Sequence, residues 1–181
     1  TFAPDDLLGP YPQSKRAAEQ AVLDAAAKGL RGVIGLPTMP VGPGDYGLTG
    51  PTKMILDYVN GKTPAFVNTR MNLIDVRDLA EAHIALRDRG QAGERYILGG
   101  NNIWMADMLA SLEQVSGVKM PSAKVPYHLA LAVAVINETW ADRISHKPPV
   151  APLTGVRIAG RRLDFQTAKA KRELGLTVRP L

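Results

Sequence analysis

Residues 11–22 read YPQSKRAAEQAV, and this stretch decides the fold of the first part of the chain. Pro12 suits the first turn of a helix, because its fixed φ is helical and its missing N–H needs no partner there. Alanine and valine then recur at steps of three and four residues, which is the period of an α-helix. Gly29 provides an end for this helix. Tyr11 and Lys15 are therefore expected one turn apart on the same face.

A tyrosine and a lysine at this spacing can serve as an acid/base pair. A phenol titrates near pH 10 in model peptides, and an ammonium group close by favours the phenolate. Such a phenol can exchange a proton with a substrate hydroxyl or carbonyl near neutral pH. The alternative is a chance meeting of two surface residues, because a pattern of two residue types at one spacing often arises by accident.

The segments that follow predict a parallel sheet covered by helices. Gly32–Leu36 and Arg95–Leu98 have the apolar composition of buried strands, and Asn72–Ile74 is extended before a helix. We expect Asp75 or Asp78 to cap that helix and not to act in catalysis. Prolines at positions 37, 40, 43 and 51 predict that no regular element crosses this loop. Further helices are predicted over 106–115, 127–144 and 167–174, with a strand over 162–165.

The loop contains a glycine pattern that imitates a nucleotide-binding motif. Gly42-Pro43-Gly44-Asp45-Tyr46-Gly47 matches G-x-G-x-x-G. Its context differs from the dinucleotide fingerprint: no helix opens on the third glycine, Pro43 lacks an N–H for the pyrophosphate, and Asp45 adds a negative charge. We therefore interpret this segment as a substrate-side loop.

Several motifs together resemble the extended short-chain dehydrogenase/reductases. In chain order they are Tyr11-x-x-Ser14-Lys15-x-x-Ala18-Glu19, Pro37-Thr38-Met39-Pro40-Val41-Gly42-Pro43-Gly44-Asp45, Asn72–His83 and Glu94–Gly100. More narrowly, the chain is similar to the NAD-dependent epimerase/dehydratase family, near its dihydroflavonol-reductase-like and hopanoid-associated sugar epimerase branches. The likeness is continuous in order as far as Gly100, and the remaining residues are less distinctive.

The resemblance implies a fold class and a division into domains. We expect an α/β fold, the later part of a Rossmann-type parallel sheet with a small helical substrate-binding domain. Residues 1–48 and 72–101 would form the remainder of the NAD(P)-binding Rossmann domain, and residues 49–71 and 102–181 the substrate-binding domain. The amino-terminal nucleotide-binding half, with its glycine-rich turn and a catalytic serine or threonine, would be absent, so the chain would be a carboxyl-terminal portion.

The resemblance also implies roles for particular residues. Tyr11 and Lys15 would be catalytic and would bind the cofactor, NAD or NADP. Pro37 and Thr38 would line the nicotinamide. On the substrate side the candidates are Asn72 and Arg70, although Arg70 matches the diphosphate-binding arginine of nucleotide-sugar epimerases only loosely.

Three functions remain open at this stage. The first is an NAD(P)-dependent epimerase/dehydratase-type oxidoreductase that acts on a sugar-like substrate. The second is an NADPH-dependent ketone reductase of the dihydroflavonol-reductase kind, which is favoured by Leu36, where many relatives have Asn or Arg before the proline. The third is a non-catalytic binding protein on the same scaffold, against which the intact Tyr11 and Lys15 argue.

The composition excludes several other kinds of site. The 181 residues include no cysteine, which excludes disulfides, thiolate metal sites and a cysteine nucleophile. The three histidines lie far apart, so no metal site is predicted. The net charge of +5 lacks interleaved aromatic residues, so no nucleic-acid partner is expected. No apolar run approaches the roughly 20 residues of a spanning helix. We expect a cytoplasmic protein with a small-molecule substrate, and leave a homodimer open.

Overall fold

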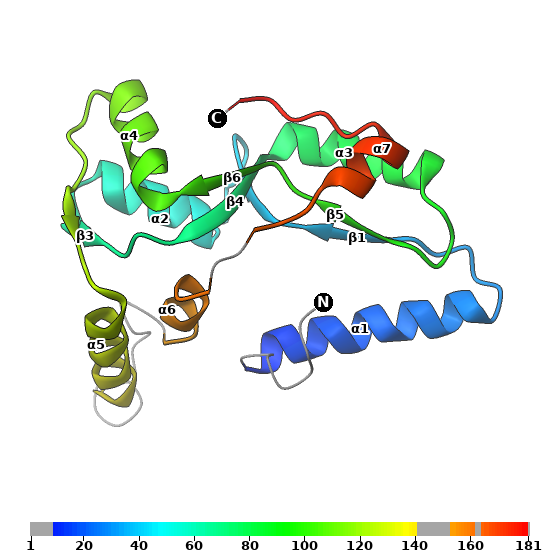
Figure 1. Ribbon diagram of the computed structural model, residues 1–181, viewed down its shortest axis with the longest axis horizontal. Coiled ribbons are helices and arrows are strands. Elements are labelled where there is room, and N and C mark those ends of the chain that lie inside the picture. Colours follow the sequence, from blue (N-terminus) through cyan, green and yellow to red (C-terminus); the bar gives the residue numbers. More distant parts are fainter. Residues whose placement is uncertain (1–8, 141–152, 162–163, 181) are drawn as a thin grey trace. The chain divides into compact units, whose positions relative to one another are not determined.

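The computed structural model describes residues 9–140, 153–161 and 164–180 (Figure 1). In chain order the elements are α1 (Pro10–Ala27), β1 (Ile34–Pro37), β2 (Met39–Val41), α2 (Gly50–Val59), β3 (Ala65–Phe66), β4 (Arg70–Asp75), α3 (Val76–Arg89), β5 (Arg95–Leu98), β6 (Asn101–Trp104), α4 (Met105–Ser116), β7 (Ala123–Lys124), α5 (Tyr127–Trp140), α6 (Leu153–Ala159) and α7 (Ala168–Leu174). Helices thus alternate with short strands, as an α/β fold requires.

Three strand pairs, β1–β5, β2–β4 and β3–β7, are parallel. β1 lies beside β5, with Ile34 opposite Arg95 and Pro37 opposite Leu98. β2 pairs in parallel with β4, which has β6 as its other neighbour, and β3 pairs in parallel with β7. The expected α/β class with parallel strands is confirmed.

The chain divides into two compact units. The first unit contains the described residues up to Gly42, Leu73–Asn101 and Phe165–Pro180, and the second contains Pro43–Asn72 and Asn102–Asp164. The sequence grouping placed residues 165–180 with the substrate-binding part, whereas in space they belong to the first unit. The reason is hydrophobic burial, because α7 and the residues after it contribute to the core of that unit. The assignment of nucleotide and substrate binding to separate parts stays a prediction.

The core of the first unit lies between the β1–β5 pair and the helices α3 and α7 (Figure 1). Leu79, Ala82 and Leu86 recur at steps of three and four along α3, so they form one buried face. They pack with Tyr96 and Leu98 of β5, which are completely buried. Through β5, this packing supports the carboxyl end of β1, where Pro37 lies.

The prediction that no regular element crosses residues 37–51 was wrong. β2 occupies Met39–Val41 with Pro40 at its centre. Proline is tolerated there because β2 is the edge strand of its sheet, so the missing N–H of Pro40 interrupts no pairing on the open side. The next helix, α2, begins at Gly50 with Pro51 in its first turn, a position that suits proline.

The predicted helices are largely confirmed. α1, α4 and α7 follow the predicted ranges to within about two residues. The predicted helix over 127–144 is described as far as Trp140, and its remaining residues lie outside the described part of the chain. Of the predicted strand over 162–165, Arg162 and Leu163 lie outside the described residues, and Asp164 and Phe165 are not in a strand.

Candidate functional site

Tyr11 and Lys15 lie together at the start of α1. The Lys15 Nζ atom is 5.5 Å from the centroid of the Tyr11 ring, which agrees with the expected spacing of one helical turn. Tyr11 is 71% exposed. Neither the Tyr11 hydroxyl nor the Lys15 ammonium forms a hydrogen bond or ion pair with any residue that the structure describes, so both polar groups are open to a ligand.

Ser14 uses its hydroxyl within the same helix. Its Oγ donates a hydrogen bond of 2.8 Å to the carbonyl oxygen of Tyr11. A serine that satisfies the backbone in this way is a local helix feature. The Ser14 hydroxyl therefore has a structural role in α1, and the catalytic serine or threonine that the resemblance implies stays a prediction.

Pro37 and Thr38 lie at the carboxyl end of β1. The backbone N–H of Thr38 donates to the carbonyl oxygen of Leu98 at 3.1 Å, so β5 holds this turn in place. In open parallel sheets, ligands bind beyond the carboxyl ends of the strands. The structure thus pairs Tyr11 with Lys15 on α1 and places Thr38 directly after Pro37, the last residue of β1. The meeting of these two pairs across one ligand stays a prediction.

Gly42, the first glycine of the loop, is packed closely against Val76. A Cβ atom added to Gly42, whose φ is +148°, would lie 2.7 Å from Cγ1 of Val76, so the space that a missing side chain leaves is occupied by protein. The Asp45 carboxylate accepts hydrogen bonds from the backbone N and Oγ1 of Thr49, at 2.9 and 2.5 Å. These bonds hold the pKa of Asp45 below its usual range. A loop packed by Val76 and carrying a carboxylate does not fit a pyrophosphate.

The acidic residues at the start of α3 have structural partners. Asp75 is the N-cap, and its Oδ1 accepts from the backbone N–H of Arg77 at 2.8 Å. The Arg77 guanidinium also donates to both carboxylate oxygens, which holds the pKa of Asp75 well below its usual range. Asp78 is paired with Arg179. The N-capping interpretation is confirmed for Asp75.

Arg70 and Asn72, the substrate-side candidates, are both engaged on β4. The Arg70 Nε donates to the Asp164 carboxylate, and its guanidinium lies over the Trp104 ring at 5.5 Å from the centroid. Asn72 is 2% exposed, and its Nδ2 donates to Oδ1 of Asn102 at 2.8 Å. Both contacts lie within the second unit, so these side chains have a structural use whether or not they meet a substrate.

Arg70 also borders a pocket of about 360 Å³ in the second unit. Its aromatic wall is formed by Trp104 and Tyr127, and Gly160 lies so close to Tyr127 that an added Cβ would be 2.4 Å from the ring. Neither Trp104 nor Tyr127 is among the site residues expected from the sequence. No local motif marks either residue, because the pocket joins segments that are distant in sequence.

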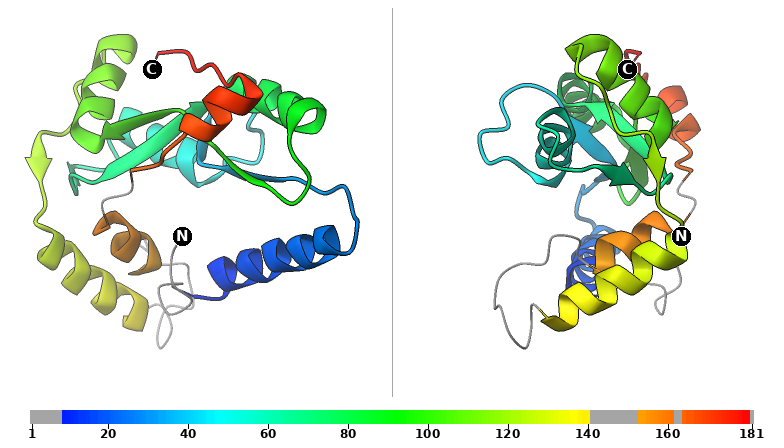
Figure 2. Two further views of the ribbon diagram at one scale, coloured as in Figure 1. Left: turned by 45° about the vertical axis from the view of Figure 1, so that its right-hand side comes forward. Right: turned by 90° about the vertical axis from the view of Figure 1, so that its left-hand side faces the viewer.

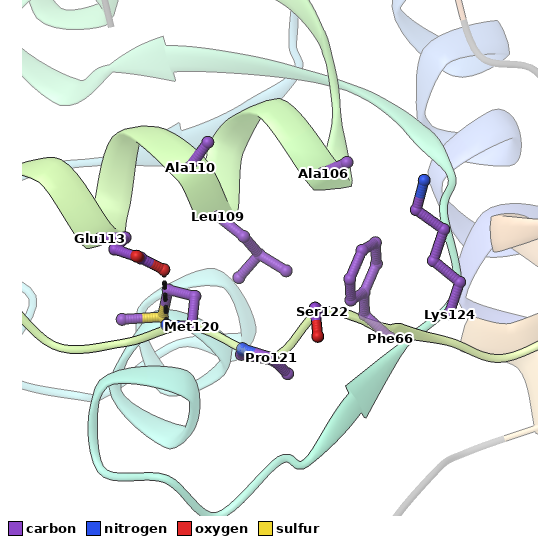
Figure 3. A pocket seen from close by; sticks show the side chains of 9 residues that line it. All are labelled: Phe66, Ala106, Leu109, Ala110, Glu113, Met120, Pro121, Ser122 and Lys124. Atoms are coloured by element: carbon purple, nitrogen blue, oxygen red, sulfur yellow. Dashed lines mark hydrogen bonds between the residues drawn. The ribbon is translucent and has the colours of Figure 1, made fainter.

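A second pocket of the same unit lies between α4 and residues 120–124 (Figure 3). Its volume is about 260 Å³, and its walls are mostly apolar, with Phe66, Leu109 and Met120 facing inward. The Glu113 carboxylate accepts a hydrogen bond of 2.8 Å from the backbone N–H of Met120, which closes one end. None of the predicted site residues lines this pocket.

Comparison with known proteins assigns the chain to a family. Residues 2–99 match the model of the NAD dependent epimerase/dehydratase family. A protein of Synechocystis sp. that carries the provisional name dihydroflavonol 4-reductase is 39% identical, over 95% of this chain and 51% of its own length. Sterol demethylase protein B of Methylococcus capsulatus is 28% identical, over 97% of this chain and 54% of its own length.

Comparison with solved structures supports the same family. The crystal structure of gox2253 is 37% identical, with a TM-score of 0.82 over 99% of this chain and 55% of that one. PA4631, a nucleoside-diphosphate-sugar epimerase from Pseudomonas aeruginosa, is 25% identical, with a TM-score of 0.77 over 100% of this chain and 58% of that one. The chain therefore spans about half the length of the relatives it matches. It belongs to the NAD-dependent epimerase/dehydratase family.

Proposed function

We propose that this chain carries the acid/base pair of an NAD(P)-dependent oxidoreductase that reduces a ketone, or oxidises the corresponding secondary alcohol. The observation that carries the proposal is the Tyr11–Lys15 pair at the start of α1, with both polar groups open to a ligand. Family membership supports it, because the family is named for its dependence on NAD. Because the chain spans about half of its relatives' length, the activity is proposed for an enzyme of the relatives' full length that includes this chain.

Each residue has a defined task in this proposal. When bound, the nicotinamide cofactor supplies the reducing equivalents at the carbonyl carbon. The Tyr11 hydroxyl donates its proton to the carbonyl oxygen, and in the reverse direction the Tyr11 oxygen takes the proton of the alcohol. The Lys15 ammonium stabilises the negative charge that remains on the Tyr11 oxygen. By family resemblance, Lys15 also holds the ribose hydroxyls of the cofactor.

The residues present fit the nicotinamide side of such a cofactor. Tyr11 and Lys15 offer a hydroxyl and an ammonium with no competing partner among the described residues, and Pro37 with Thr38 provides a wall at a strand end. The adenosine side has no counterpart among the described residues, since Val76 occupies the space beside Gly42 and the same loop carries the Asp45 carboxylate. We propose that residues outside these 181 hold the pyrophosphate.

Ketone reduction is favoured over sugar epimerisation by the contacts that the Arg70 side chain makes within the protein. Binding a nucleotide diphosphate needs an available cation, whereas the Arg70 guanidinium already binds the Asp164 carboxylate and lies over the Trp104 ring. The 39% identical relative is named for a reductase activity, which points the same way. Epimerisation of a nucleotide sugar is the second candidate, supported by the name of PA4631.

The balance of cofactor distinguishes the two reactions. The enzyme, extended to the length of its relatives, would be incubated with NADH or NADPH and either a dihydroflavonol or a UDP-hexose. Reduction consumes one cofactor for each product, whereas epimerisation interconverts the sugars with no net consumption. Product formation that is equal in wild type and Tyr11→Phe would contradict both, because neither route could then depend on this hydroxyl.

A further inference from the structure

Helix α5 exposes its apolar side to solvent. Leu129, Ala132, Val133 and Ile136 recur at steps of three and four residues, so they share one face, and all four are exposed. Leu129 is 57% exposed and Ile136 is 66% exposed. Between Tyr127 and Thr139 the exposed positions of α5 are His128, Leu129, Ala132, Val133, Val135, Ile136 and Thr139. None of them is an acid, a lysine or an arginine.

The opposite side of α5 is partly covered and includes two polar residues. Asn137 and Glu138 are half-buried there, next to the completely buried Ala134. The Glu138 Oε2 accepts a hydrogen bond of 3.0 Å from the backbone N–H of Leu153, the first residue of α6. The helix thus departs from the usual pattern of a surface helix, because large apolar side chains lie on its exposed side and not only on its covered side.

α6 packs against α5 as an antiparallel partner (Figure 2). The end of α5 meets the start of α6 through Glu138 and Leu153, and the start of α5 meets the end of α6 where Gly160 touches Tyr127. Arg157 and Ile158 are exposed on α6, and Ile158 is a further large apolar side chain in contact with water. The two helices form a hairpin that carries both apolar and cationic side chains on its exposed surface.

The sequence of this hairpin and its flanking residues is rich in lysine and arginine. Between residues 119 and 162 the sequence has seven lysines and arginines against two acids, so this segment alone has a net charge of +5, the same as the whole chain. Lys119, Lys124 and Arg157 have no carboxylate partner among the residues that the structure describes. An uncharged apolar face beside unpaired cations is complementary to an anionic surface with an apolar interior.

We propose that the α5–α6 hairpin binds the surface of a membrane that contains anionic lipids. Leu129, Val133 and Ile136 would enter the boundary between headgroups and acyl chains, and cations such as Arg157 would meet the lipid phosphates. The hairpin would lie on the bilayer, since no helix in the described ranges is long and apolar enough to cross one. A second copy of the chain is a poorer occupant, because one short stripe buries less area than a stable dimer interface needs and the cations would repel.

Vesicle flotation tests the proposal on the 181-residue chain. The chain would be mixed with vesicles of phosphatidylcholine alone, or of phosphatidylcholine and phosphatidylglycerol in equal parts, and centrifuged in a density gradient. Bound protein floats with the lipid while aggregated protein sinks, so adhesion through misfolding is separated from binding. We expect the chain to float with the anionic vesicles only, and to be released at about 1 M salt, where the screening length falls to about 3 Å.

Matched variants test whether the exposed apolar face of α5 is the surface that binds the vesicles. The triple change Leu129→Gln, Val133→Gln, Ile136→Gln should lower the partition coefficient at least about tenfold, because it removes the inserted side chains. The control Ile84→Gln changes a side chain that is similarly exposed, at 55%, on α3 of the first unit, and should float like wild type. Circular dichroism would confirm that both variants retain the helix content of wild type.

Three outcomes would overturn the proposal. The first is no flotation with anionic vesicles. The second is flotation of the triple variant equal to that of wild type. The third is a lipid-free dimer, measured by light scattering, that the triple variant dissociates, because the face would then be a contact between copies of the chain.

Discussion

Arg179, near the end of the described chain, is bound to Asp78 in the first turn of α3. The Arg179 Nε lies 2.7 Å from Oδ1 of Asp78, and the backbone N–H of Arg179 donates to the other carboxylate oxygen at 2.9 Å. The Asp78 side chain is 5% exposed, so its charge depends on this partner. The contact joins residues 101 positions apart and holds the carboxyl-terminal segment on the first unit.

Replacing Arg179 by Gln should destabilise the first unit by about 3 kcal/mol, because it leaves a buried carboxylate without its cation. Arg172→Gln is the matched control. It removes a cation that pairs with Glu173 and is 68% exposed, and surface pairs of this kind contribute only about 0–1 kcal/mol. Urea unfolding of the two variants gives the comparison, and equal midpoints would mean that the Asp78 pair is not important for stability.

The stability of the first unit should fall in acid. Arg77 holds the pKa of Asp75 well below the value of about 3.9 expected in the unfolded chain. The ionised carboxylate therefore stabilises the fold fully above that value, and the contribution is lost as the pH falls from about 5 downward. Asp75→Asn keeps an N-capping side chain but cannot titrate. Its urea midpoint should therefore change less than that of wild type when the pH falls below about 5.

Glu81→Gln, at an exposed position of α3, is the control for this titration and should keep the pH dependence of wild type. If Asp75→Asn lost stability in acid as steeply as wild type, the Asp75–Arg77 contact would not be its source.

Tyr11→Phe should lower the turnover number of the extended enzyme by roughly 10²–10⁴-fold, because it removes only the proton-transferring hydroxyl. Cofactor binding should remain. Ser14→Ala is the control on the same helix turn, since the Ser14 hydroxyl is used on the backbone of Tyr11. Single-turnover kinetics would measure both variants, and near-wild-type turnover in Tyr11→Phe would remove Tyr11 from the mechanism.

Lys15→Met should weaken cofactor binding and lower turnover together, because one ammonium serves both the cofactor and the Tyr11 oxygen. Lys28→Met, at the other end of α1, removes an equal charge from an exposed position and should leave both quantities unchanged. Fluorescence titration with NADH and steady-state kinetics would give the two numbers. A Lys15→Met enzyme with normal affinity and normal turnover would show that the lysine has no such role.

The 181-residue chain by itself should bind NADH and NADPH weakly. It offers a nicotinamide-side wall, whereas in its glycine loop Val76 occupies the space beside Gly42 and Asp45 adds a carboxylate. Calorimetric titration should therefore give a Kd well above 1 μM, which corresponds to about −8 kcal/mol of binding. A Kd at or below that concentration would show that the loop from Gly42 to Gly47 does hold the pyrophosphate.

Local sequence determined much of the fold. The spacing of apolar residues along α1 and α3 predicted both helices, and apolar runs predicted β1 and β5, because helix and strand periodicity is written in neighbouring residues. The family motifs end at Gly100, and the matching family model ends at Gly99. Tyr11 and Lys15 meet because one helical turn separates them, which the sequence alone implies.

Tertiary structure decided the features that depend on distant partners. β2 runs through Pro40 because it lies at a sheet edge, and Arg70 is occupied because the chain brings Asp164 to it. The exposure of α5 was equally invisible in sequence: its apolar run is typical of a helix that is buried or lies at an interface, and Leu129 and Ile136 are exposed in this chain. A sequence pattern shows that a face is apolar, but only the packing of α6 against the opposite side decides which face is covered.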